Sequence, residues 1–283
     1  MYGLQAPDVE RWSSRVVVVR GLNPGPFTGP GTNTYLVGTG SSPILIDTGS
    51  GVDGYVPLLE KALRDEFDAA RPSQILLTHA HRDHLGGVHT LLRHFGHVPV
   101  SKLPWPARDE ALRITATREG DSFYTDGVRL RALHCPGHAQ DHLCFYLEEE
   151  QALFTGDVVL GMGTTVIPLE GGDMAAYLAS LRRIRQLPLE RIYPGHGPKI
   201  DDPLARVDAY IEHRAERERQ ILDAMRAGAA TVREMVERIY RETPRSLHAA
   251  AAQSVLSHLR KLEAEKRVRP RVDAGGETHW TLP

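Results

Sequence analysis

Residues 79–84 read His79-Ala80-His81-Arg82-Asp83-His84, which places three imidazoles and one carboxylate within six residues. Side chains at alternate positions of an extended segment share a side, so His79 and His81 are expected to converge. Asp83 and His84 are then expected to face a different direction. One metal ion cannot use all four donors comfortably, whereas two ions can. The stretch therefore predicts a dinuclear metal site.

The flanking sequence places this stretch in a layered fold. Residues 74–78 are expected to form a strand that delivers His79 at its carboxyl end, and Gly86-Gly87 is expected to open a helix. Strands are also predicted at 16–19, 34–37, 128–132, 143–147, 152–155 and 191–193. Layered α/β folds build their sites at the carboxyl ends of strands, so this pattern indicates an α/β enzyme.

Further ligands are expected far along the chain. His138, Asp157 and His196 each follow a predicted strand, and each stands beside a glycine, which lets the backbone approach a crowded centre. Imidazole and carboxylate donors suit Zn²⁺, although Mn²⁺ and Fe²⁺ stay open. Two ions about 3.5 to 4 Å apart can hold a bridging hydroxide. The sequence thus predicts two zinc ions and hydrolytic chemistry.

The composition is that of an ordinary globular protein. The 283 residues are 41% hydrophobic and 25% charged, which excludes collagen-like, disordered and disulfide-scaffold classes. Only two cysteines occur, Cys135 and Cys144, and we expect a reducing compartment. The first residues show no signal peptide and no membrane-spanning stretch. A cytoplasmic protein without a membrane partner is the expectation.

The composition changes beyond Pro203, so we predict a domain of residues 1–204 and a second of residues 205–283. The second part carries 15 Lys/Arg and 12 Asp/Glu, a charge of +3, against 19 and 24, or −5, in the first. A helix is expected at 204–225, and Thr231 and Glu234 predict a capping box. Helical segments at 246–252 and 254–266 and a terminal hairpin complete a winged-helix-like pattern.

The metal-binding pattern resembles the metallo-β-lactamase superfamily, in which His-x-His-x-Asp-His precedes a later His, Asp and His. Further stretches, among them Gly31-Thr32-Asn33-Thr34 and Tyr193-Pro194-Gly195-His196, and the winged helix are similar to the group called β-lactamase-like protein 2. The resemblance covers nearly the whole chain. It implies a four-layer αββα sandwich with a C-terminal winged-helix-like domain.

The resemblance also implies a role for each candidate residue. His79, His81 and His138 would hold the first zinc, Asp83, His84 and His196 the second, and Asp157 would bridge them. Asp47 matches a carboxylate that orients the histidine loop without binding metal. Asp83 and Asp157 are expected to be catalytic by orienting the hydroxide. We expect surface or packing roles for eight other histidines, namely His89, His94, His97, His134, His142, His213, His258 and His279, and we expect His248 to start a helix.

This metal centre is compatible with two classes of substrate. Relatives in the group include an endoribonuclease acting on single-stranded RNA, and similar proteins are thioesterases that release acyl chains from carrier proteins. The basic tail favours single-stranded RNA, with an acyl thioester as the alternative. The loops at 21–34 and 161–173 are expected to wall the substrate groove. A homodimer is left open.

An interpretation from another class is a winged-helix regulator that binds nucleic acid through residues 254–267 and uses the metal domain as a sensor. Arg260, Lys261, Lys266 and Arg267 would face the nucleic acid. Glu263 and Glu265 interrupt that basic face, so the enzyme is preferred.

Overall fold

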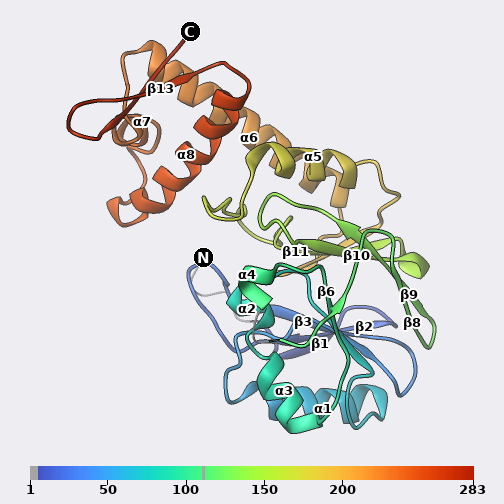
Figure 1. Cartoon of the computed structure of the whole chain (residues 1–283). Coiled ribbons are helices and arrows are strands. Elements are labelled where there is room, and N and C mark those ends of the chain that lie inside the picture. Colours follow the sequence, from blue (N-terminus) through green and yellow to red (C-terminus); the bar gives the residue numbers. More distant parts are fainter. Residues whose placement is uncertain (1–5, 110–111) are drawn as a thin grey trace. The chain divides into compact units, whose positions relative to one another are not determined.

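The computed structural model describes residues 6–109 and 112–283 (Figure 1). This part of the chain forms two compact units. The first comprises the described residues up to Cys135 together with Asp141–Thr165 and Gln186–Arg206; the second comprises Pro136–Gln140, Val166–Arg185 and Val207–Pro283. No helix among the described residues has both the length and the apolar character needed to cross a lipid bilayer.

The first unit contains a mixed seven-stranded sheet whose strands lie in chain order. Neighbours from β1 to β4 are antiparallel, and neighbours from β4 to β7 are parallel. The predicted strand at 16–19 is confirmed as β2, with every side chain buried. The strands are β1 (Val9–Arg11), β2 (Val16–Arg20), β3 (Asn33–Val37), β4 (Ile44–Ile46), β5 (Gln74–Leu76), β6 (Val100–Lys102) and β7 (Thr115–Ala116).

A second sheet of five strands has the order β12-β11-β10-β9-β8. Only the β11–β12 pair is parallel, so the carboxyl ends of these two strands lie at one edge. A short 3₁₀ turn, η1 (Glu148–Glu150), joins β10 to β11. The strands are β8 (Ser122–Thr125), β9 (Val128–His134), β10 (Leu143–Leu147), β11 (Ala152–Gly156) and β12 (Arg191–Pro194).

Alternation along β2 explains how the layers of the first unit pack. Val16 and Val18 belong to the core between the two sheets, where the rings of Tyr35 and Phe154 lie 5.0 Å apart. Val17 and Val19 point to the opposite face and pack with the apolar stripes of α1 (Tyr55–Phe67) and α3 (Val88–Phe95) (Figure 1). Two short helices, α2 (Arg82–Leu85) and α4 (Pro106–Asp109), complete the unit. The first unit therefore contains three of the four expected layers, in the order helix, sheet and sheet.

The second unit is largely helical and carries the predicted winged helix. The predicted capping box is confirmed, since Thr231 Oγ1 accepts from the Glu234 amide and the Glu234 carboxylate accepts from the Thr231 amide. Its core gathers Met235, Leu259 and Trp280 from three elements. The elements are α5 (Met174–Ile184), α6 (Pro203–Arg226), α7 (Val232–Ile239), η2 (Arg245–Leu247), α8 (His248–Ala264), β13 (Arg269–Val272) and β14 (Thr278–Thr281).

One prediction about this unit is wrong. The two helical segments expected at 246–252 and 254–266 are a single helix, α8. Neither glycine nor proline lies between them to stop the helix. Helix α6 runs across the position predicted to separate the domains, after residue 204, so that boundary stays a prediction.

Candidate metal centre

The histidine motif runs from the loop that follows β5 into the short helix α2. His79 follows the carboxyl end of β5, His81 is the N-cap residue of α2, and Asp83 and His84 lie in that helix. Asp157 and His196 follow β11 and β12, whose parallel pairing brings their ends to one edge of the second sheet. Chain segments far apart in sequence thus deliver their polar residues from strand ends.

Four of the predicted ligands form one buried cluster. One ligand atom from each of Asp83, His84, Asp157 and His196 lies within 4.8 Å of the others. Nε2 of His84 is 3.3 Å from Asp83 Oδ2 and 3.3 Å from Asp157 Oδ1, and Nε2 of His196 is 3.2 Å from the same two oxygens. Acids and imidazoles therefore alternate around one small space.

The electrostatics of this cluster suit a cation. Burial alone would lower the pKa of His196, but the Asp157 and Asp83 carboxylates raise it to about 9. Burial would also lower the pKa of His84, but the carboxylates of Asp83, Asp157 and Asp47 more than offset this effect. The pKa of His84 therefore rises well above its usual value. Burial would raise the pKa values of Asp83 and Asp157, yet the two imidazoles hold both well below the ordinary range. Protons here occupy positions that a divalent ion would take.

The remaining three predicted ligands are histidines. His79 and His81 belong to the first unit and His138 to the second, and each offers a ring nitrogen as a potential ligand. His79 Nε2 is 2.9 Å from His81 Nδ1. The four-residue cluster and these three histidines together have donors consistent with a dinuclear metal site.

Hydrogen bonds fix the orientation of three of these rings. His84 Nδ1 lies 2.7 Å from Asp47 Oδ2, and His138 Nδ1 lies 2.7 Å from the Val166 carbonyl oxygen. These oxygens can only accept, so each Nδ1 carries the proton. The Thr78 hydroxyl donates to Asp47 and in turn accepts from His79 Nδ1 at 2.9 Å. In all three rings the Nδ1 proton is engaged, which leaves Nε2 as the ligand atom.

A further observation shows that the residues fit a metal. Nε2 of His84 is fully buried and lies near two carboxylate oxygens, yet it makes no properly directed hydrogen bond within the described residues. Such an atom is costly unless a cation lies between it and the carboxylates. Glycine also keeps the site open, because a Cβ at Gly195 would lie 2.6 Å from Asp157 Oδ1.

Asp47 lies where it can support the histidine loop. Its backbone is left-handed, with φ of 60°. Its carboxylate accepts from the Thr78 amide at 2.8 Å and from His84 Nδ1, so it ties the end of β5 to α2. It is absent from both groups of potential ligands.

The sequence reasoning missed two residues beside the centre. His142, expected to be a packing residue, accepts the Asp157 amide at Nε2 over 3.1 Å, and its ring stacks on that of His79 with centroids 4.6 Å apart. Asn33 donates through Nδ2 to the Pro194 and Gly197 carbonyls, which flank His196. The only available signal for His142 was its position four residues after His138, which predicts no particular contact.

Comparison with known families decides the identity of this fold and site. Residues 27–196 match the model of the metallo-beta-lactamase superfamily, and residues 231–280 match the beta-lactamase associated winged helix domain. The chain belongs to the metallo-β-lactamase superfamily. It is accordingly a metal-dependent hydrolase with the α/β fold of that superfamily, two mixed sheets and a C-terminal winged helix.

Three relatives illustrate what the chain is similar to. It is 37% identical to a beta-lactamase-like protein 2 homolog of Drosophila melanogaster, over 98% of this chain and 97% of that one. It is 38% identical to an atrochrysone carboxyl ACP thioesterase of Aspergillus chevalieri, over 98% and 89% of the two chains. A protein solved in a di-iron-bound form is 34% identical with a TM-score of 0.52, over 65% and 96%. The resemblance expected from the sequence is confirmed.

Proposed function

We propose that the protein hydrolyses acyl thioesters of a carrier protein at two zinc ions. His79, His81 and His138 would hold one ion, and Asp83, His84 and His196 the other, with Asp157 shared. The two buried groups of donors support this assignment. Zinc suits a donor set of imidazoles and carboxylates, while manganese and iron accept the same donors.

Each type of donor in this proposal has a separate task. When bound, two divalent ions would lower the pKa of a water molecule and polarise the carbonyl oxygen of the substrate. Asp83 and Asp157 would accept hydrogen bonds from the attacking water and so orient it. Asp47 and Thr78 would keep His84 and His79 in place, because their hydrogen bonds fix both rings.

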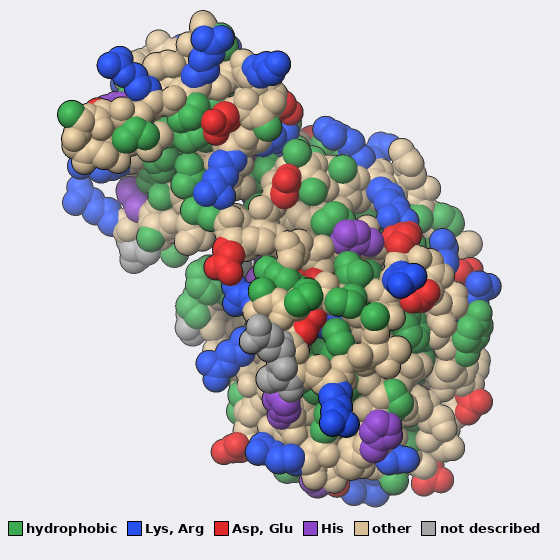
Figure 2. All heavy atoms as spheres, viewed as in Figure 1, with side chains coloured by type: hydrophobic (Ala, Val, Ile, Leu, Met, Phe, Trp, Pro, Cys, Tyr) green, Lys and Arg blue, Asp and Glu red, His purple; other side chains and the backbone are tan. Residues whose placement is uncertain are grey.

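One observation carries the choice of a thioester. The similar Aspergillus chevalieri protein is an ACP thioesterase, and the similarity extends over both the metal domain and the winged helix. The basic tail that favoured RNA is less available than its charge suggests. Lys261 lies 2.7 Å from Glu218 and 2.9 Å from Glu265, and Arg267 also pairs with Glu218. Lys and Arg side chains on the face seen in Figure 2 are spread among acidic ones and form no continuous patch.

Single-stranded RNA is our second candidate. The wing strand β13 presents Arg269 and Arg271, both exposed, and arginines of this kind bind phosphates. A cleft that holds two dications attracts phosphodiesters as well as carbonyl oxygens.

Three further proposals rest on the sequence alone. They are the domain boundary after residue 204, the cytoplasmic location and a homodimer.

A parallel assay tests the proposed function. We would compare three substrates: an acyl thioester of a phosphopantetheinylated carrier protein, a labelled single-stranded RNA and the same RNA in a duplex. Each is incubated with metal-stripped and with zinc-restored protein, and the Asp157→Asn variant reveals contaminating activity. Zinc-dependent release of the acyl chain that Asp157→Asn abolishes is the expected result. Zinc-dependent cleavage of single-stranded RNA without thioester turnover would replace this proposal by the second candidate.

A further inference from the structure

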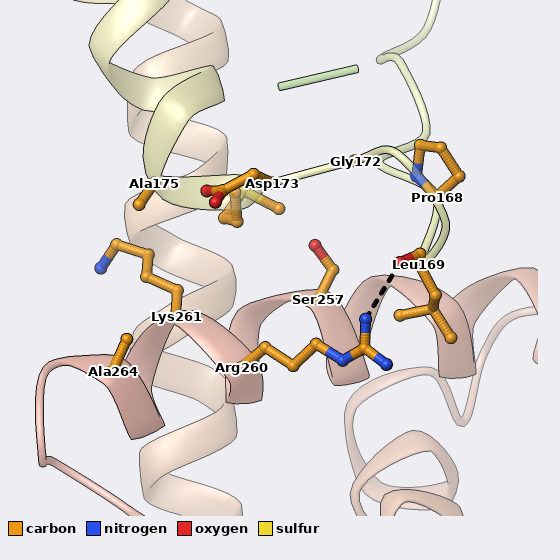
Figure 3. A pocket seen from close by; sticks show the side chains of 10 residues that line it. Pro168, Leu169, Gly172, Asp173, Ala175, Ser257, Arg260, Lys261 and Ala264 are labelled. Carbon is orange, nitrogen blue, oxygen red and sulfur yellow. Dashed lines mark hydrogen bonds between the residues drawn. The ribbon is translucent and has the colours of Figure 1, made fainter. Parts of the chain in front are cut away.

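The second unit contains a pocket of about 260 Å³ that lies between α8 and the loop leading into α5 (Figure 3). Pro168, Leu169 and Asp173 line it from the loop side. Ser257, Arg260 and Lys261 line it from one face of α8. The loop belongs to the stretch 161–173 that the sequence predicts as a wall of the substrate groove.

Ser257 is the feature that points to a ligand. The residue is 6% exposed, and its Oγ has no hydrogen-bond partner within the described residues. Figure 3 shows this hydroxyl directed from α8 into the space beneath Asp173 and beside Leu169. A buried hydroxyl loses its water without compensation unless some other polar group meets it. The pocket therefore offers a polar contact that the protein itself leaves unmade.

Arg260 supplies the cationic group of the pocket. Its Nη1 donates to the Leu169 carbonyl oxygen at 3.0 Å, which holds the guanidinium at the pocket (Figure 3). A guanidinium has five N–H donors, so others are left for an anion. Lys261 adds little charge, because Glu218 and Glu265 pair with it.

The loop side contributes the amino end of α5, a helix of 11 residues. Asp173 caps it, since its Oδ1 accepts the Ala176 amide at 2.9 Å. The carboxylate is thereby committed to its own helix, whose first-turn amides and dipole favour an anion near this end. The pocket therefore combines one guanidinium, one hydroxyl and a helix start, a combination that suits a single phosphate group.

The pocket is tied to the segment that carries His138. The Asp173 amide donates to the Gly137 carbonyl oxygen at 2.9 Å, and His138 Nδ1 bonds the Val166 carbonyl oxygen at 2.7 Å. The loop 166–173 thus begins and ends on this segment. A ligand held by this loop would therefore be held by a segment that is hydrogen-bonded to His138, which the proposed function makes a metal ligand.

We propose that this pocket binds the phosphodiester of the phosphopantetheine arm through which a carrier protein bears its acyl group. The proposal rests on the proposed function, which makes such a thioester the substrate. Arg260 would bind the phosphate, Ser257 would donate to it or meet the adjoining amide, and Leu169 would pack on the apolar part of the arm. RNA offers the same phosphodiester, but a polymer needs a row of cations, and the neighbouring Lys261 is already paired.

Direct binding tests the pocket without any need for turnover. Zinc-loaded full-length protein is titrated calorimetrically with free phosphopantetheine and with pantetheine, which lacks the phosphate. We expect phosphopantetheine to bind at least about tenfold more tightly, and Arg260→Gln to remove that preference. Ser257→Ala, which removes the hydroxyl without adding bulk, should weaken binding several-fold. Arg271→Gln, a variant of an exposed arginine on β13, is the matched control and should change nothing.

A preference for phosphopantetheine that survives Arg260→Gln, or no preference at all, would overturn the pocket assignment. Loss of single-stranded RNA binding in Arg260→Gln, with no phosphopantetheine binding in the wild type, would overturn it in favour of RNA.

Kinetics then separate this inference from the proposed function. Arg260→Gln should raise KM about tenfold for the carrier-bound thioester and leave kcat and the hydrolysis of a short N-acetylcysteamine thioester unchanged. Equal hydrolysis of the carrier-bound thioester by variant and wild type would reject the pocket and keep the function. Phosphate-dependent binding that Arg260→Gln removes, without hydrolysis of either thioester, would reject the function and keep the pocket.

Discussion

His196 in the metal cluster and His258 in α8 are both buried, yet their surroundings move their pKa values in opposite directions. Burial opposes a charged imidazole in both places. Around His196 the carboxylates of Asp157 and Asp83 more than offset burial, and its pKa rises to about 9. Around His258 burial is reinforced by the cations Arg214, Lys261 and Arg217, and its pKa falls to about 3.

The difference shows that burying histidines does not by itself make a metal site. Carboxylates beside the ring create a negative space that protons or divalent ions fill, whereas arginine and lysine beside the ring repel both. His258 accordingly belongs to no group of potential ligands among the described residues. The charged side chains beside each histidine thus decide which of the two buried regions can bind a metal ion.

Removing a carboxylate from the first region should give the largest effect. Asp157→Asn keeps the shape of the side chain but deletes the charge that lies between His84 and His196. We expect hydrolysis to fall on the order of 10³-fold and one metal ion to be lost. Steady-state kinetics and elemental analysis measure both. An Asp157→Asn protein with nearly full activity would remove Asp157 from the mechanism.

The pH dependence of stability should also differ between the two regions in metal-stripped protein. His196 has a raised pKa when folded, so its contribution is present below about pH 6.5 and is lost as pH rises towards 9, at most about 3 kcal/mol. His258 has a lowered pKa, so stability is lost as pH falls from about 6.5 towards 3. Urea unfolding across this range measures both limbs.

Single substitutions assign each limb to its residue. His196→Leu should lessen the alkaline limb, to which His84 also contributes, and His258→Leu should lessen the acid limb and leave the alkaline limb unchanged. Zinc should abolish the alkaline limb of the wild type, because it displaces the protons. An alkaline limb that is unchanged in His196→Leu would contradict the assignment.

Substitution of Asp47 should have a smaller effect, because Asp47 acts on the metal centre only through its hydrogen bonds with His84 and Thr78. Asp47→Ala removes the acceptor of His84 Nδ1 and of Thr78, and zinc affinity should fall roughly tenfold or more. Competition with a fluorescent zinc chelator gives the affinity. Asp53→Ala, which changes an exposed residue of the same loop, should leave it unaltered. Equal zinc affinity in Asp47→Ala and wild type would make Asp47 a turn residue.

The sequence predicted the parts of the centre that are local or lie at strand ends. The motif at 79–84 fixes four donors within one loop, and Asp157 and His196 each follow a strand of clear apolar character. The hydrogen bond from His142 to Asp157 and its stacking on His79 depend on tertiary packing that no spacing encodes.

Other features of the fold were equally out of reach. The fully buried Lys102, which lies 2.6 Å from Asp141 and 2.9 Å from Asp109, contradicts the usual exposure of lysine. Strands of two or three residues, such as β7 and β1, are too short to show a period. The Ser257 pocket depends on a loop and a helix that are far apart in the sequence.

The number of metal ions bound by the chain decides whether it is a dinuclear hydrolase. Protein purified under zinc-replete conditions is analysed by elemental analysis, stripped with a chelator and titrated with zinc while hydrolysis is followed. We predict about two ions per chain, with activity that vanishes on stripping and returns as the second ion binds. A well-folded protein that holds no more than one ion and is fully active would contradict it.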